Sequence, residues 1–151
     1  DAEPLEGLVI MRLDTPLYYF NATAVTDRVL QVVDEAEELP RAVLLDIEAT
    51  IELDVTTSDA IYGLIGAVED RGSRLVIVHA KGTVRDRMRK VGLIERLGST
   101  GMYPTERVAV EALAEAWERE DASVGETDDG DGSAATDEDS GVAVDGPSSG
   151  H

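Results

Sequence analysis

The chain has 151 residues, of which 42% are hydrophobic, so it is long enough to bury one core of ordinary domain size. Its formal net charge is −19, and a surface so acidic repels nucleic-acid phosphates instead of binding them. It contains no cysteine and only two histidines, far apart in sequence, so we expect no disulfide, no metal site and no cofactor. No stretch approaches the roughly 20 apolar residues of a membrane span.

The first predicted elements are two short strands followed by a helix. Residues 8–13 are mainly apolar, and after a turn that contains a proline the aromatic segment 17–20 returns, which predicts a β-hairpin. Asn21 suits the N-cap of a helix whose apolar residues recur at helical spacing over residues 22–39. Pro40 then ends this helix.

The next strand and helix form the centre of the predicted fold. Residues 42–46 read as a buried strand, and Asp54 precedes a helix expected over about residues 55–71. Asp54 can cap that helix by accepting a hydrogen bond from the amide of Thr56 or Thr57. Three hydroxyl side chains crowd the positive end of the helix: Thr56, Thr57 and Ser58. They could accept a phosphate or contact an anion, or they could be ordinary first-turn residues that satisfy free amides.

The rest of the ordered chain repeats the alternation of strands and helices. Thr83 is predicted to cap a short helix, with Asp86 in a variant of the capping-box position, and Gly92 ends that helix. The lone His79, at the end of a buried strand, is interpreted as a structural histidine. The remaining predicted elements are a strand at 74–79, a helical turn at 93–97, a strand at 102–103 and a helix over 104–120.

This order predicts an α/β fold with a mainly parallel sheet, an antiparallel edge strand and about four flanking helices. The sequence divides into a short leading segment at 1–6, a folded domain at 7–120 and a tail at 121–151. The tail holds nine acidic residues and no lysine or arginine, so residues 1–120 carry a formal charge of −10. The tail is predicted to be disordered because it cannot bury enough apolar surface to offset its ordering entropy.

Three segments resemble the cytoplasmic STAS domain of SulP-family sulfate permeases and related anion transporters. Residues 7–22 match its apolar strand, turn and aromatic segment ending in Phe-Asn-Ala. Residues 45–46 and 53–60 resemble its strand, acidic cap and hydroxyl-bearing helix start, and residues 91–93 precede a short strand and an Ala-rich helix, as in the family. The resemblance extends over about residues 7–118 and implies the STAS fold, which is also that of the anti-sigma-factor antagonists.

The resemblance implies a regulatory and interaction domain, not an enzyme, on the cytoplasmic side of the cell membrane. Residues 1–6 would then be the linker from a preceding membrane part. The implied partners are the transmembrane part of the same transporter, a second STAS domain in a dimer, and an anion or nucleotide sensed at the start of the second helix.

Anti-sigma-factor antagonists are switched by phosphorylation of a serine two residues after the aspartate, and Thr56 occupies that position here. Thr57 stands where antagonists usually carry glycine, which favours the transporter branch. The alternative function is therefore a free-standing regulator of the antagonist type, switched at Thr56.

The expected partner surface combines aromatic and basic side chains. Tyr18, Tyr19 and Phe20 alternate across the predicted strand, so some of them must face outward, while core packing accounts for the others. The only concentration of basic residues lies on or just before the predicted short helix, where it forms either a solvated helix face or a contact with an anion, an acidic partner or lipid headgroups. From it we select Lys81 and Arg85 as partner-surface residues.

Overall fold

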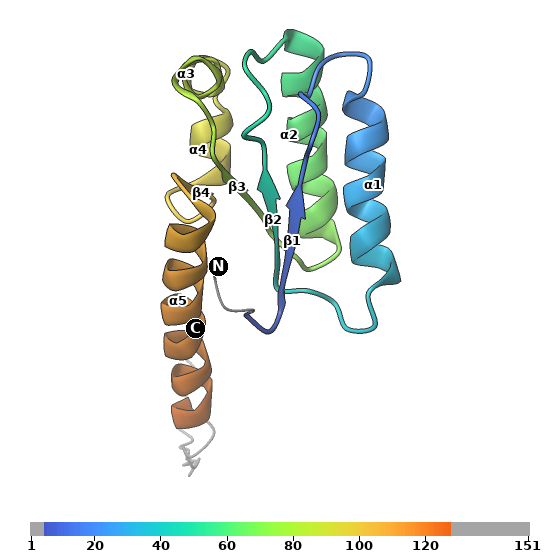
Figure 1. Ribbon diagram of the computed structural model, residues 1–151. Helices are drawn as coiled ribbons and strands as arrows, with labels where there is room; N and C mark the ends of the chain where they lie inside the picture. Colours follow the sequence, from blue (N-terminus) through green and yellow to red (C-terminus); the bar gives the residue numbers. More distant parts are fainter. Residues whose placement is uncertain (1–4, 128–151) are drawn as a thin grey trace, which may run out of the picture.

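The computed structural model describes residues 5–127, and it contains one sheet flanked by helices (Figure 1). The elements run in the order β1 (Leu8–Arg12), α1 (Ala22–Glu35), β2 (Ala42–Asp46), α2 (Val55–Asp70), β3 (Leu75–Val78), α3 (Gly82–Lys90), α4 (Leu93–Leu97), β4 (Met102–Tyr103) and α5 (Glu106–Thr127). The α/β fold is therefore confirmed, and none of the helices within residues 5–127 is long and apolar enough to cross a membrane.

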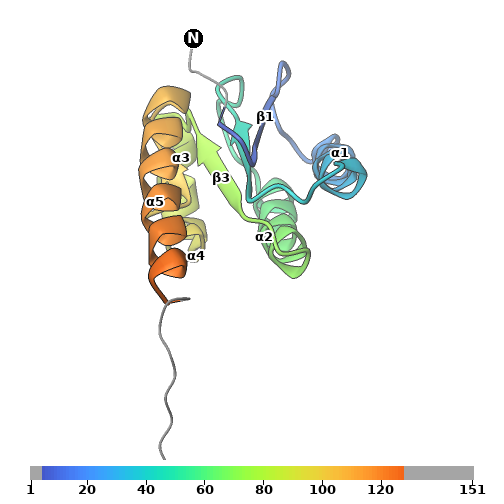
Figure 2. The same cartoon turned by 90° about the horizontal axis from the view of Figure 1, so that it is seen from below.

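The four strands are all parallel and pair in the order of the chain, β1-β2-β3-β4. The register sets Ile10 beside Leu44 and Leu44 beside Val76. Figure 2 shows the sheet between two layers, with α1 and α2 on one side and α5 on the other. The central strands β2 and β3 are buried along their whole length, which is why they read as continuous apolar runs.

Alternating side chains of the central strands build two separate cores. Val43 and Leu45 point into the larger core, which they share with buried residues of α1, α2, α3 and α4. Leu44 points the other way, into a smaller core closed by Leu113 and Trp117 of α5. Because both faces of the sheet are covered, its strand ends are left as the place where surface side chains can gather.

The predicted hairpin is wrong, and with it the antiparallel edge strand. Residues 17–20 form a loop and turn, and every strand pair in the described residues is parallel. The reason is that side chains, not a neighbouring strand, satisfy this segment's amides. The Leu17 amide donates to Thr50 Oγ1 at 2.9 Å, and the Tyr19 amide donates to Asp54 Oδ2 at 2.8 Å.

Two helix boundaries also differ from the prediction. Helix α1 ends at Glu35 and not near residue 39, because Ala36 is already extended and the chain continues to Pro40 without helix. Helix α5 continues to Thr127, so residues 121–127 are helical and not part of a tail. The remainder of the predicted tail, 128–151, and residues 1–4 lie outside the described residues.

Helix α2 ends as its sequence predicts. Gly72 has a φ of +88°, the left-handed conformation that favours glycine. Its amide donates to the Glu69 carbonyl, and the Ser73 amide donates to the Val68 carbonyl. This pair of hydrogen bonds is the Schellman arrangement, which satisfies carbonyls that the helix end would otherwise leave free.

Candidate functional site

The candidate site lies at the carboxyl ends of the parallel strands. In Figure 1 the loop from β1 to α1, the start of α2 and the helix α3 all lie at the upper end of the molecule, toward which β1 and β2 point. Connections at this edge of a parallel sheet are free to carry binding groups because the strands below them fix their positions.

Asp54 joins two of these segments through its carboxylate. Its Oδ1 accepts the amide of Thr57 at 2.7 Å, which caps α2 as the sequence predicts. Its Oδ2 accepts the amide of Tyr19 from the loop between β1 and α1. One side chain therefore fixes the start of α2 and the position of the aromatic loop together.

These contacts also set the ionisation of Asp54. Partial desolvation is the largest single influence and raises the pKa of the carboxyl group, but hydrogen bonding from Thr57 and from the Tyr19 amide together outweighs it. The pKa of Asp54 therefore lies below its ordinary value, because the ionised form is the better acceptor.

Asn21 stands at the N-cap position of α1, but the predicted side-chain cap does not form. Its Oδ1 accepts the amide of Tyr18 at 2.9 Å, and its Nδ2 donates to the carbonyl of Pro16 at 2.8 Å. The side chain closes the turn in front of the helix instead of capping the helix, so Asn21 and Asp54 together hold the loop at 16–20.

The loop presents three aromatic rings to solvent. Tyr18 is 43% exposed, Tyr19 67% and Phe20 77%, so the predicted division into inward and outward rings is wrong. The ring centroids of Tyr18 and Phe20 lie 6.1 Å apart in a stacked arrangement, and Tyr19 meets Tyr18 edge-on at 5.8 Å. Together with the exposed Ile51 and Val55, these rings are called the aromatic patch below.

The three hydroxyl residues at the start of α2 differ in exposure. Thr57 and Ser58 are buried, and the Ser58 hydroxyl donates to the carbonyl of Asp54 at 3.0 Å. Thr56 is exposed. Only Thr56 of the three is therefore placed where a partner or a kinase could reach it.

Helix α3 lies beside the aromatic patch. Arg87 lines a groove of about 510 Å³ with Tyr18, Ile51 and Asp54. Lys81 and Arg85 are exposed as expected, but Arg85 lines a different groove with Met102 and Tyr103. Sequence reasoning missed Ile51 and Val55 as site residues. It counted Arg87 in the basic cluster but did not place it beside the aromatic loop, because only the fold brings these segments together.

The predicted cap of α3 is wrong. Lys81 occupies the N-cap position, and the Thr83 hydroxyl donates to the carbonyl of Ile51 at 2.6 Å. Asp86 pairs with Arg89 at 3.2 Å instead of reaching back to the helix start. The Thr83 bond ties α3 to the loop that precedes α2.

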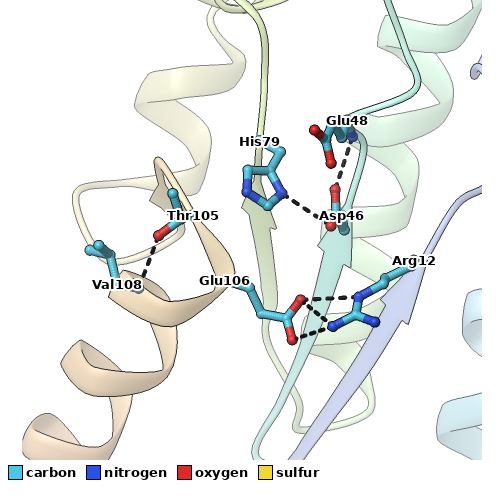
Figure 3. A network of polar contacts seen from close by, with 7 residues as sticks. All are labelled: Arg12, Asp46, Glu48, His79, Thr105, Glu106 and Val108. Carbon is cyan, nitrogen blue, oxygen red and sulfur yellow. Dashed lines mark hydrogen bonds and ion pairs between the residues drawn. The ribbon is translucent and has the colours of Figure 1, made fainter. Parts of the chain in front are cut away.

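A second polar cluster lies at the same edge, toward α5 (Figure 3). Asp46, at the end of β2, is 6% exposed; its Oδ1 accepts the amide of Glu48, and its Oδ2 lies 3.0 Å from His79 Nδ1. His79 has a φ of +61° and follows β3 directly. Nearby, Arg12 forms a bidentate ion pair with Glu106 of α5, with contacts of 2.9–3.1 Å.

Asp46, Glu48 and His79 are the residues of the described chain that could hold a metal ion, since one ligand atom of each lies within 4.8 Å of the others. Sequence reasoning missed this grouping because it considered the two histidines alone. The available signal was that Asp46 and His79 each end a predicted strand, and neighbouring parallel strands bring such residues together.

Comparison with known proteins agrees with this architecture. A family model described as the STAS domain matches residues 1–109. The chain is 30% identical over 125 residues to a probable sulfate transporter of Arabidopsis thaliana, and 31% identical over 112 residues to a probable sulfate transporter of Mycobacterium tuberculosis. These matches cover 78% and 74% of this chain but 19% and 20% of the relatives, so the chain spans about a fifth of their length.

Solved structures show the same fold. The STAS domain of a SulP transporter from Vibrio cholerae has a TM-score of 0.67 at 20% identity, covering 78% of this chain and 88% of that chain. The murine Solute Carrier 26 family member A9 anion transporter, in its inward-facing state, has a TM-score of 0.65 at 21% identity, covering 76% of this chain and 19% of that chain.

Replacement of Asp54 tests its bridging contacts. Asp54→Ala removes the acceptor for both amides, and we expect it to lower the free energy of unfolding at neutral pH by about 1–2 kcal/mol. Asp54→Asn keeps an acceptor for the Thr57 amide but leaves the Tyr19 amide without one. We therefore expect it to lower the free energy of unfolding by less than Asp54→Ala does. Urea unfolding of the three proteins measures the difference.

The same comparison has a defined pH dependence. Because the pKa of folded Asp54 is lowered, its stabilisation is present above the unfolded pKa of about 4 and is lost as the pH falls through the folded pKa. The difference in the free energy of unfolding between wild type and Asp54→Ala should therefore become smaller in acid. If this difference is absent at neutral pH, or becomes larger in acid, the role given to the Asp54 carboxylate is contradicted.

Proposed function

The chain belongs to the STAS domain family, and from this premise we propose that it is the regulatory domain of a SulP-type sulfate or related anion transporter. In this proposal it lies on the cytoplasmic side of the cell membrane and contacts the transmembrane part of the same protein. It is not an enzyme and does not itself carry the anion. Two relatives named as probable sulfate transporters, each about five times as long as the matched segment, support this assignment.

The observation that carries the proposal is the aromatic patch. Large apolar side chains this exposed, gathered at one place, are typical of a surface that another protein covers. Tyrosine and phenylalanine are enriched in such contacts because they bury much area and have few side-chain torsions to order. The Asp54 and Asn21 contacts hold the loop in place before a partner arrives, which lowers the entropy cost of binding.

The start of α2 fits a protein contact better than an anion or a nucleotide. The Asp54 carboxylate already occupies the positive end of this helix and uses the Thr57 amide. A second negative charge there would be repelled by it and by Asp59 in the next turn. We therefore keep protein contact as the proposed function of this surface, and contact with a second STAS domain stays a prediction.

The contact with the membrane part can be tested in trans. The segment that precedes this chain in its parent protein should contain roughly ten or more spans of about 20 apolar residues. We expect the purified membrane part to bind the 151-residue chain, and the double variant Tyr19→Ser, Phe20→Ser to bind at least about 30-fold more weakly, as for loss of an interface hot spot. A fluorescence titration of the labelled chain measures the affinity.

Val108→Ser is the matched control, because Val108 is also exposed but lies on α5, away from the aromatic patch. Its affinity should equal that of the wild type. Equal affinity of the double variant, or a parent protein without apolar spans, would refute the proposed function.

The exposure of Thr56 favours one alternative, a free-standing regulator of the antagonist type that is phosphorylated at this residue. The transporter proposal predicts that the chain stays unmodified when it is incubated with an anti-sigma-type kinase and ATP. Mass spectrometry gives the answer, with Thr56→Val as the control. A phosphate on the wild type that is absent from Thr56→Val would replace the transporter proposal with the alternative.

A further inference from the structure

In a strongly acidic chain, the basic side chains that have no partner among the described residues lie on α3 and on Lys81 just before it. All thirteen lysines and arginines of the sequence lie within the described residues, and five of them lie between positions 81 and 90. Among described residues, the side chains of four of these five have no hydrogen bond or ion pair: Lys81, Arg85, Arg87 and Lys90. The fifth, Arg89, pairs with Asp86, the one acidic residue of α3.

The arginines outside α3 are all engaged. Each of the eight has a hydrogen bond or ion pair with another side chain: Arg12 with Glu106, Arg28 with Gln31, Arg41 with Glu120 and Asp121, Arg71 with Asp34, Arg74 with Thr100, Arg96 with Glu69, Arg107 with Glu111, and Arg119 with Glu115. Lys81, Arg85, Arg87 and Lys90 thus differ from the other basic residues, because their side chains have no partner within the described part of the chain. A surface of this kind is available for an external anion.

The apolar residues of α3 do not compete for this role. Val84 and Met88 are fully buried in the larger core, so the helix turns its basic side chains outward and has no apolar face to insert into a bilayer. A contact made by such a helix would be electrostatic and would lie at the level of lipid headgroups.

The aromatic patch adjoins α3. Arg87 shares a groove with Tyr18 and Ile51 of the patch and with the acidic residues Glu52 and Asp54. The Thr83 hydroxyl holds α3 against the Ile51 backbone. A transmembrane part that covers the aromatic patch would bring α3 within reach of the lipid headgroups.

From these observations we propose that the exposed basic face of α3 binds the headgroups of anionic lipids and lays this edge of the sheet against a membrane surface. The proposal rests on the proposed function, since a domain attached to a transporter lies within reach of lipid. It adds a second contact, with the bilayer itself, to the protein contact made by the aromatic patch.

Vesicle sedimentation tests this without any membrane protein, so its outcome is separate from that of the transporter contact. The 151-residue chain is mixed with vesicles of phosphatidylcholine alone or of phosphatidylcholine with phosphatidylglycerol, at about 0.1 M salt, where the screening length is about 10 Å. We expect sedimentation only with the phosphatidylglycerol vesicles. This result is diagnostic because a chain of charge −19 would otherwise be repelled by them.

Two triple variants with the same change of charge provide the comparison. Arg85→Gln, Arg87→Gln, Lys90→Gln should weaken binding about 100-fold, since each basic residue near an anionic surface contributes about fivefold. Arg28→Gln, Arg107→Gln, Arg119→Gln removes three exposed arginines whose partners lie in their own helices, and should leave binding near that of the wild type. Circular dichroism checks that both variants fold.

Asp86→Asn tests the proposal through tighter binding, so its outcome does not depend on a variant that loses affinity. It removes the one acid of α3, so the vesicle affinity should rise by about fivefold. The proposal is overturned if the wild type ignores phosphatidylglycerol vesicles, or if both triple variants lose binding equally. It is also overturned if inorganic phosphate displaces the chain and chloride at equal ionic strength does not, because α3 would then be a site for a free anion.

Discussion

The presentation of the aromatic patch depends on the two oxygens of one carboxylate. Asp54 Oδ1 caps α2 and Asp54 Oδ2 holds the amide of Tyr19, so the beginning of a helix and a loop 35 residues earlier in the chain share one anchor. A serine cap offers a single oxygen on a shorter side chain, whereas the carboxylate presents a separate oxygen to each amide. The loop's backbone is satisfied in this way while its three aromatic side chains stand exposed at the surface.

Three kinds of exposed group lie at the same edge of the sheet. The aromatic rings of the loop, the exposed Thr56 and the unpaired cations of α3 all lie there, while the other arginines are engaged in hydrogen bonds or ion pairs across the rest of the surface. The Thr83 bond to Ile51 joins α3 to the loop before α2, and Arg87 lines the same groove as Tyr18. In the proposed function, these apolar and basic groups on one side of an acidic domain would turn that side toward the membrane-bound partner.

The sequence was sufficient for the parts of this structure that depend on neighbours along the chain. The apolar runs of β2 and β3, the Asp54 cap and the glycine end of α2 follow from local spacing and capping chemistry. The sequence was not sufficient where a residue far away in the chain determines the local structure. Tyr18-Tyr19-Phe20 has the composition of a strand, but Thr50 and Asp54 take the hydrogen bonds that a strand would need, and the hydroxyl of Thr83 is drawn to Ile51. Arg87 joins the site only because α3 lies beside the aromatic loop, which local spacing does not encode.

The central claim is that the carboxyl edge of the sheet faces the membrane, and a cryo-electron microscopy structure of the whole parent protein in a lipid nanodisc tests it most directly. The account predicts that Tyr19 and Phe20 are covered by the membrane part and that α3 lies at the level of the headgroups. A structure in which this edge faces away from the bilayer, with both rings in solvent, would contradict it.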